Sequence, residues 1–132
     1  MILNKYATIE DYLQLYNAEI GDSKKERLIM LLDLASSLLR EEARERGHDL
    51  DRMIERNPDK ANVAKLVVLA SVRRVMSKEE EDSLNLQQFS QSAMGYTISG
   101  TYFNPGDDLY FLKNELSRLG LNRQKITSIS LI

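Results

Sequence analysis

Apolar positions along most of the chain follow helical spacing. The clearest pattern lies between Gly21 and Gly47, where apolar residues recur every three or four positions and mark one face of a helix. This apolar stripe consists of Leu28, Leu31, Leu32, Ala35, Leu38, Leu39 and Ala43. Gly47 follows a mixed-charge stretch and provides the left-handed conformation that ends many helices. The pattern therefore predicts a helix of roughly 35 Å, at about 1.5 Å per residue.

Two capping patterns precede the long stripe. Thr8 stands three residues before Asp11, so its hydroxyl can accept a backbone N–H while the carboxylate reaches back, which predicts the start of a short helix. Ser23 and Glu26 repeat this arrangement and predict the start of the long helix.

Further helices are expected after Gly47. Leu50–Ile54 predicts a short helical turn, and Asn57–Asp59 predicts the start of another helix that runs to Met76. The run Ala64–Val72 is apolar on nearly every side, and a small bundle covers two sides of such a helix, so we expect a neighbouring subunit to cover the rest. The acidic run Glu79–Asp82 opposes the dipole of a helix C-terminus, which suggests that the helix ends before it.

A last helix is predicted near the C-terminus. Asp107 or Asp108 is expected to cap it, and Gly120 to end it. Its buried stripe is predicted to be Leu109, Leu112, Leu116 and Leu119. The expected fold is therefore an all-α, small helical bundle.

Two segments break the helical pattern. Residues 83–106 carry no charge, are rich in Ser, Gln, Thr and Tyr, and alternate like a strand near their centre; residues 122–132 also alternate. We expect one helical domain, residues 1–121, with an extended loop at 83–106 that orders on assembly, followed by a strand-like tail at 122–132. The large apolar side chains of both segments are the candidate interface residues: Phe89, Met94, Tyr96, Ile98, Tyr102, Phe103, Ile126, Ile129 and Leu131. A hairpin folded onto its own bundle and a frayed tail are the alternatives.

The composition contains few residues that could catalyse a reaction or bind a metal ion. The chain lacks cysteine, and its single histidine, His48, follows a predicted helix end without partner ligands nearby in the sequence. The acidic run Glu79–Asp82 is more typical of a solvated helix end than of a cation site. We therefore predict no catalytic residues, no metal site and no cofactor.

Charge and hydropathy further narrow the classes of protein to which the chain could belong. The formal net charge is −2, with acids and bases mixed along the chain, so the concentrated positive field of a non-specific DNA binder is missing. The N-terminus lacks the order of a signal peptide, and the longest apolar runs are far shorter than the roughly 20 residues that span a bilayer. We expect a soluble protein that is intracellular when made.

The order of several sequence segments resembles that found in a known protein family. The opening Tyr6–Leu13, the stretch Gly47–Ile54 after the long helix, the apolar helix Asn62–Met76 and the tyrosine-rich Tyr96–Gly106 follow one another as in the head–tail connector proteins of tailed phages. Leu109–Phe111 and Leu119–Leu121 complete the pattern. Phe103 departs from it, and the tail from Asn122 lies outside it.

This resemblance implies a structural subunit of the phage neck. Such adaptors form a ring on the portal protein, which implies a dodecamer here. They extend the DNA channel, through which DNA passes without specific binding, and provide the docking surface for the next connector, stopper or tail-completion protein. The expected location is the virion, after synthesis in the host cytoplasm.

Two other classes of protein remain open from the sequence. A small helical DNA-binding regulator or antitoxin would need a basic recognition helix, for which Arg73 and Arg74 are the candidates. An enzyme with its site in the uncharged loop would have only tyrosine for acid–base chemistry.

Overall fold

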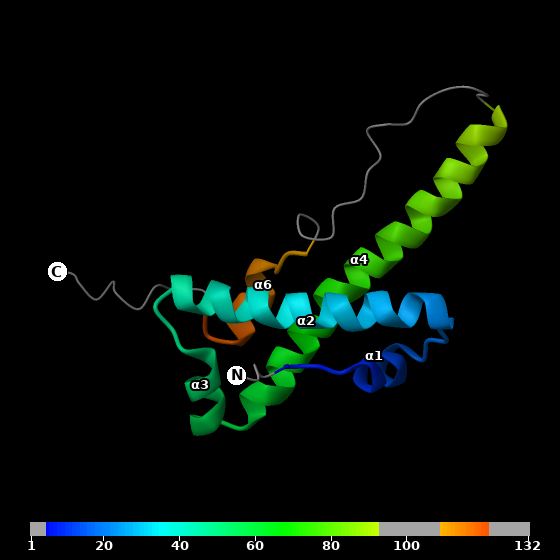
Figure 1. Cartoon of the computed structure of the whole chain (residues 1–132). Helices are drawn as coiled ribbons and strands as arrows, with labels where there is room; N and C mark the ends of the chain where they lie inside the picture. The colour runs from blue at the N-terminus through cyan, green and yellow to red at the C-terminus, as the bar shows by residue number, and fades with distance from the viewer. Residues whose placement is uncertain (1–4, 93–108, 122–132) are drawn as a thin grey trace.

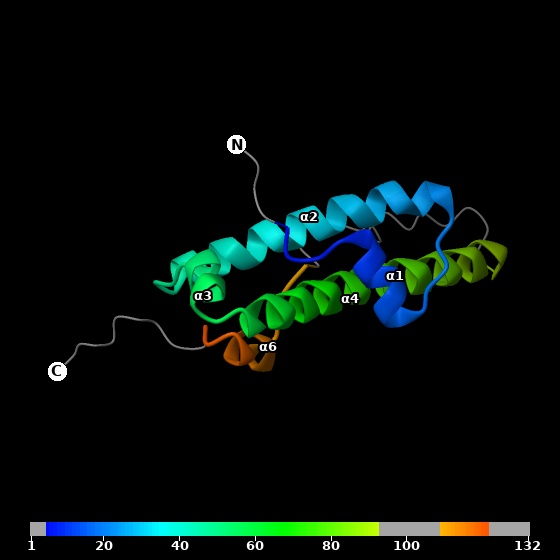
Figure 2. The ribbon, with the colours of Figure 1, turned by 90° about the horizontal axis from the view of Figure 1, so that it is seen from below.

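The computed structural model describes residues 5–92 and 109–121, with side chains up to Glu80 and again from Leu109. Within these ranges the chain forms helices and no strand, which confirms the all-α prediction. The helices are α1 (Ile9–Tyr16), α2 (Asp22–Glu45), α3 (Leu50–Arg56), α4 (Asp59–Ser92) and α6 (Lys113–Arg118). Helices α2 and α4 form the central pair, with α1, α3 and α6 placed around them (Figures 1 and 2).

Helix α1 begins with the predicted capping box. The backbone N–H of Asp11 donates to Thr8 Oγ1 at 3.2 Å, and the N–H of Thr8 donates to Asp11 Oδ2 at 2.9 Å. These bonds satisfy two donors that the first turn would otherwise leave without a partner. The bond from Thr8, assisted by the nearby Lys65, holds the pKa of Asp11 below its usual range.

The lowered pKa predicts a pH-dependent contribution to stability. Asp11→Asn is expected to reduce the free energy of unfolding at pH 7 by about 1 kcal/mol, the usual contribution of a cap. Because the folded-state pKa of Asp11 is depressed, this contribution is present above the unfolded pKa, near 4, and is lost as the pH falls through the folded value. Urea unfolding of both proteins at pH 7 and pH 3 checks this. A difference in stability that persists unchanged at pH 3 would contradict it.

The start of α2 differs from the prediction. Helix α2 begins at Asp22 after Gly21, and no side chain caps it, so the predicted capping box of Ser23 and Glu26 is wrong. Ser23 already lies inside the first turn, where it cannot act as the N-cap. The C-terminal end of α2 agrees with the prediction, because Gly47 has a φ of 84° and the N–H of His48 donates to the carbonyl of Ala43 at 2.8 Å.

The core lies between α2 and α4. The buried side chains of α2 include the predicted stripe from Leu28 to Ala43, with one exception: Leu38 is exposed. From α4 the core receives Ala64, Val67, Val68, Leu69, Val72 and Val75. Leu66 is the exposed member of the apolar run 64–72, so the bundle covers more of this run than we predicted.

Helix α4 continues well past the predicted end. It includes the acidic run Glu79–Asp82 and reaches Ser92, so the prediction that the helix ends before the acids is wrong. The first part of the predicted extended loop, residues 83–92, is therefore helical. The C-terminal part of α4 extends away from α2, beyond the bundle (Figure 1). This projection, residues 80–92, is about 20 Å long at 1.5 Å per residue.

Helix α6 is shorter than the predicted last helix. It begins at Lys113, after a non-helical segment that starts at Leu109, so neither Asp107 nor Asp108 caps it. The N–H of Leu112 instead donates to the carboxylate of Glu115 at 2.8 Å. Leu109, Leu116 and Leu119 are buried as predicted, whereas Leu112 is exposed.

Candidate assembly interface

The segment 109–121 is anchored to the bundle by its leucines. Leu109, Leu116, Leu119 and Leu121 are all buried. Gly120 has a φ of 81°, which lets the chain turn at the end of α6 and brings the N–H of Leu121 to the carbonyl of Leu116 at 2.8 Å. The two ends of this segment are therefore held in place by the core.

An ion pair between α4 and α6 strengthens this anchoring. Arg74 donates to both carboxylate oxygens of Glu115, at 2.9 and 3.0 Å, and to the carbonyl of Tyr110 at 2.7 Å. Its guanidinium also lies 4.6 Å from the centre of the Tyr110 ring. The Glu115 side chain is 9% exposed, so this bidentate pair lies largely away from solvent.

Two more cations bind the backbone near the end of this segment. Lys60 donates to the carbonyl of Leu119 at 3.0 Å, and Arg46 donates to the carbonyl of Leu121 at 3.2 Å. Leu119 is the C-cap of α6, where a cation is favourable, and Leu121 lies two residues further along the chain. Lys60 comes from α4 and Arg46 from the end of α2, so the segment is tied to both central helices.

None of the nine predicted interface residues is placed by the structure. Phe89 belongs to α4, but its side chain lies outside the described residues. The other eight lie wholly outside them: Met94, Tyr96, Ile98, Tyr102, Phe103, Ile126, Ile129 and Leu131. They stay predictions.

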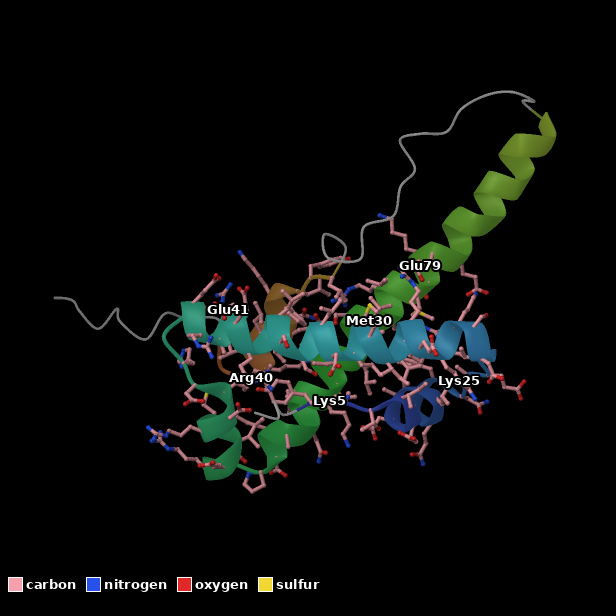
Figure 3. The ribbon with its side chains drawn as sticks, viewed as in Figure 1. Lys5, Lys25, Met30, Arg40, Glu41 and Glu79 are labelled. Atoms are coloured by element: carbon pink, nitrogen blue, oxygen red, sulfur yellow. The ribbon has the colours of Figure 1, made fainter. Side chains whose placement is uncertain are left out.

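The structure shows an exposed apolar surface that the sequence reading missed. Met30, Leu34 and Leu38 are 59%, 42% and 38% exposed. They recur every four residues along α2, so they form one row on the face opposite the core, and Figure 3 shows Met30 on that outward face. This apolar row could have been found from the second set of apolar positions on the helix, at a spacing of four. The spacing of the buried stripe instead places Leu38 in the core, which the structure contradicts.

The N-terminal segment is fixed to α2 and α3 by Tyr6. Its N–H donates to Ser36 Oγ at 3.1 Å and its hydroxyl to Asp51 Oδ1 at 2.7 Å, while Arg40 lies 4.9 Å from its ring centre. Burial, followed by the bond to Asp51, raises the pKa of the Tyr6 hydroxyl. Tyr6 thereby links α2 to α3 and leaves the apolar row uncovered.

The candidate DNA-contacting arginines are engaged within the fold. Arg73 lies 4.8 Å from the ring centre of Tyr16 on α1, and Arg74 is held by Glu115. A recognition helix needs side chains that can reach base edges. These contacts weigh against the DNA-binding alternative.

The described residues provide no positive sign of a metal site or a membrane span. Within 5–92 and 109–121, no group of three or more His, Asp or Glu side chains is arranged to hold a metal ion. In the same part of the chain, no helix has the length and apolar character needed to cross a bilayer.

A small helical bundle with an uncovered apolar row and a projecting helix is typical of a protein that works inside a larger assembly. The comparison with protein families agrees with this class. Residues 18–131 match the family described as Phage protein Gp19/Gp15/Gp42, and the chain belongs to this family of bacteriophage structural proteins. Neither the curated proteins nor the solved structures gave a match.

Proposed function

We propose that the chain is a subunit of the phage neck that assembles as a ring on the portal protein. The ring extends the DNA channel and offers the docking surface for the next connector, stopper or tail component. Membership of a phage structural family supports a role in the virion. The observation that carries the assembly is the apolar row Met30, Leu34 and Leu38, which the fold itself leaves exposed.

The arrangement of the anchored segments also supports this proposal. The described chain resumes at the buried Leu109 and ends at the buried Leu121. The predicted loop and the predicted tail therefore each adjoin a residue fixed in the core. A fixed attachment point reduces the entropy that a segment loses when a neighbour binds it.

The charge balance is consistent with passage of DNA through such a ring. The net charge of −2 gives little attraction for the phosphate backbone, so the wall would not retain the genome. The alternative, a helical DNA-binding regulator or antitoxin, is less favoured because Arg73 and Arg74 are already bound within the bundle.

Mutation of the apolar row tests the proposal. The triple variant Met30→Gln, Leu34→Gln and Leu38→Gln is expected to fold normally, because all three side chains are exposed and glutamine favours helix almost as well as leucine. Its retention on the portal of the same phage should fall at least roughly tenfold, since a combined loss of about 1.4 kcal/mol from the three apolar side chains gives this factor. Co-sedimentation with the portal measures this.

Leu15→Gln is the matched control, because Leu15 is an equally exposed apolar residue on α1, away from the row. It should be retained like the wild type. A triple variant that is retained as well as the control would contradict the role of the row in assembly.

A further inference from the structure

The apolar row of α2 is part of a longer ridge on that helix. Side chains four residues apart follow one another as a continuous ridge along a helix surface. The apolar row, which begins at Met30, occupies the first three positions of this ridge. The next two positions are Glu42 and Arg46, which pair with each other at 2.9 Å at the C-terminal end of α2. The ridge therefore leads from the end of α2 directly to the apolar row.

The described part of the chain ends beside this ridge. Arg46 donates to the carbonyl of Leu121 at 3.2 Å, and the Leu121 side chain is buried in the core. Residues 122–132 continue from this point. The tail is therefore attached at the end of the ridge from which the apolar row is reached.

The distances from this attachment point to the apolar row follow from the helix geometry. Leu38, Leu34 and Met30 precede Arg46 by 8, 12 and 16 residues. At about 1.5 Å per residue they lie about 12, 18 and 24 Å from it along the axis of α2. The ridge is inclined by about 26° to this axis, which lengthens each path by about a tenth.

The apolar residues of the tail match these distances. Ile126, Ile129 and Leu131 follow Leu121 by 5, 8 and 10 residues. An extended chain spans about 3.3 Å per residue, so these three residues reach about 16, 26 and 33 Å from Leu121. Each reach exceeds the corresponding path on α2. The three apolar residues of the tail can therefore meet the three members of the apolar row one to one and in order.

Attachment favours the chain's own tail over the tail of a second copy. A segment joined to its binding surface by a short flexible link has an effective concentration in the millimolar range. Free copies at micromolar concentration compete poorly with it. The tail of the same chain is therefore the occupant that the geometry supports.

We infer that residues 122–132 lie along the apolar row of the same chain in the free subunit, and that the portal displaces them on assembly. The covering of the row is independent of the proposed ring, whereas the displacement rests on the proposed function. Covering removes an apolar surface through which free subunits would otherwise associate with one another. The row then becomes available only where a portal competes for it.

A disulfide between the tail and the row tests the covering. The chain lacks cysteine, so only introduced cysteines react. In dilute protein, Leu34→Cys with Ile129→Cys should form a disulfide within one chain. The matched control is Ser37→Cys with Ile129→Cys, because Ser37 is also exposed and lies nearer to Arg46 along α2. The row pair should react at least roughly tenfold faster than the control pair, measured by mass spectrometry of non-reduced peptides.

The same protein tests the displacement. With its disulfide formed, the row variant should be retained on the portal at least roughly tenfold less than after reduction, because the locked tail cannot leave the row. Circular dichroism checks that both forms are folded. Equal rates of disulfide formation in the two pairs, or a disulfide that joins two chains, would overturn the inference. Equal retention of the oxidised and reduced forms would overturn the displacement. Failure of the wild type to bind the portal would instead contradict the proposed function, and the disulfide rates decide the covering without the portal.

Discussion

Glu115→Ala is expected to lower the free energy of unfolding by about 3 kcal/mol, because it leaves a largely buried arginine without its partner. Glu115 accepts two bonds from Arg74 and one from the N–H of Leu112, so the substitution removes the link between α4 and α6 together with the cap of α6. Equilibrium unfolding in urea measures the loss. Faster hydrogen exchange in residues 109–121 should accompany it, since these residues are held by the same contacts.

Glu41→Ala is the control for this prediction. Glu41 pairs with Arg44 on α2, and both side chains are well exposed. Surface pairs of this kind contribute less than about 1 kcal/mol. Equal losses of stability in the two variants would contradict the anchoring role of Glu115.

Leu39→Ala is expected to cost about 3 kcal/mol of stability, from lost burial and the cavity left behind. Leu39 is 0% exposed and lies on the face of α2 that packs against the core. Thermal and urea unfolding both report the change. The far-ultraviolet circular dichroism of the variant at low temperature should stay helical, because the helix itself is not interrupted.

Leu34→Ala makes the same substitution on the opposite face of α2, where Leu34 is 42% exposed. Its cost in stability should be below about 0.5 kcal/mol, as for most surface changes. We expect this variant instead to bind the portal more weakly. Similar losses of stability for both leucines would mean that the apolar row is part of the fold and not of an interface.

The elements that the sequence predicted correctly are those that depend on residues close together in the sequence. The capping box of Thr8 and Asp11 needs only two side chains three residues apart, and it forms as predicted. Gly47 ends α2 because its left-handed conformation is favourable without a side chain. The core positions of α2 follow from spacing alone, apart from Leu38.

The wrong predictions concern where helices start and end, because the local sequence alone does not determine these positions. Ser23 and Glu26 form a valid capping pattern, but the N-cap of α2 is Gly21, two residues before Ser23, so the serine is already helical. The macrodipole argument at Glu79–Asp82 assumed a helix end, yet α4 continues to Ser92, and the dipole effect is confined to the last turn. These acids therefore carried no information about the end of the helix.

The start of α6 also depends on tertiary contacts. Leu109 is buried without being helical, and α6 begins only where the Glu115 carboxylate can accept the N–H of Leu112. The position of Glu115 is in turn fixed by Arg74, 41 residues earlier in the chain. Spacing within the last segment could not reveal that partner.

The candidate interface was only partly accessible to sequence reasoning. The nine side chains predicted for it lie outside the described residues, so they stay predictions. The spacing of four marks the apolar row of α2 as a second set of apolar positions, but only the structure shows that the bundle leaves this side of the helix exposed. Sequence spacing gives the faces of a helix but does not say which face is covered.

The mass of the protein in solution, alone and after mixing with the portal of the same phage, tests the proposed ring most directly. Light scattering after size-exclusion chromatography gives both values. We expect the portal complex to gain the mass of a ring of subunits, and the row variant to reduce that gain. A protein that leaves the mass of the portal unchanged would contradict the proposed function.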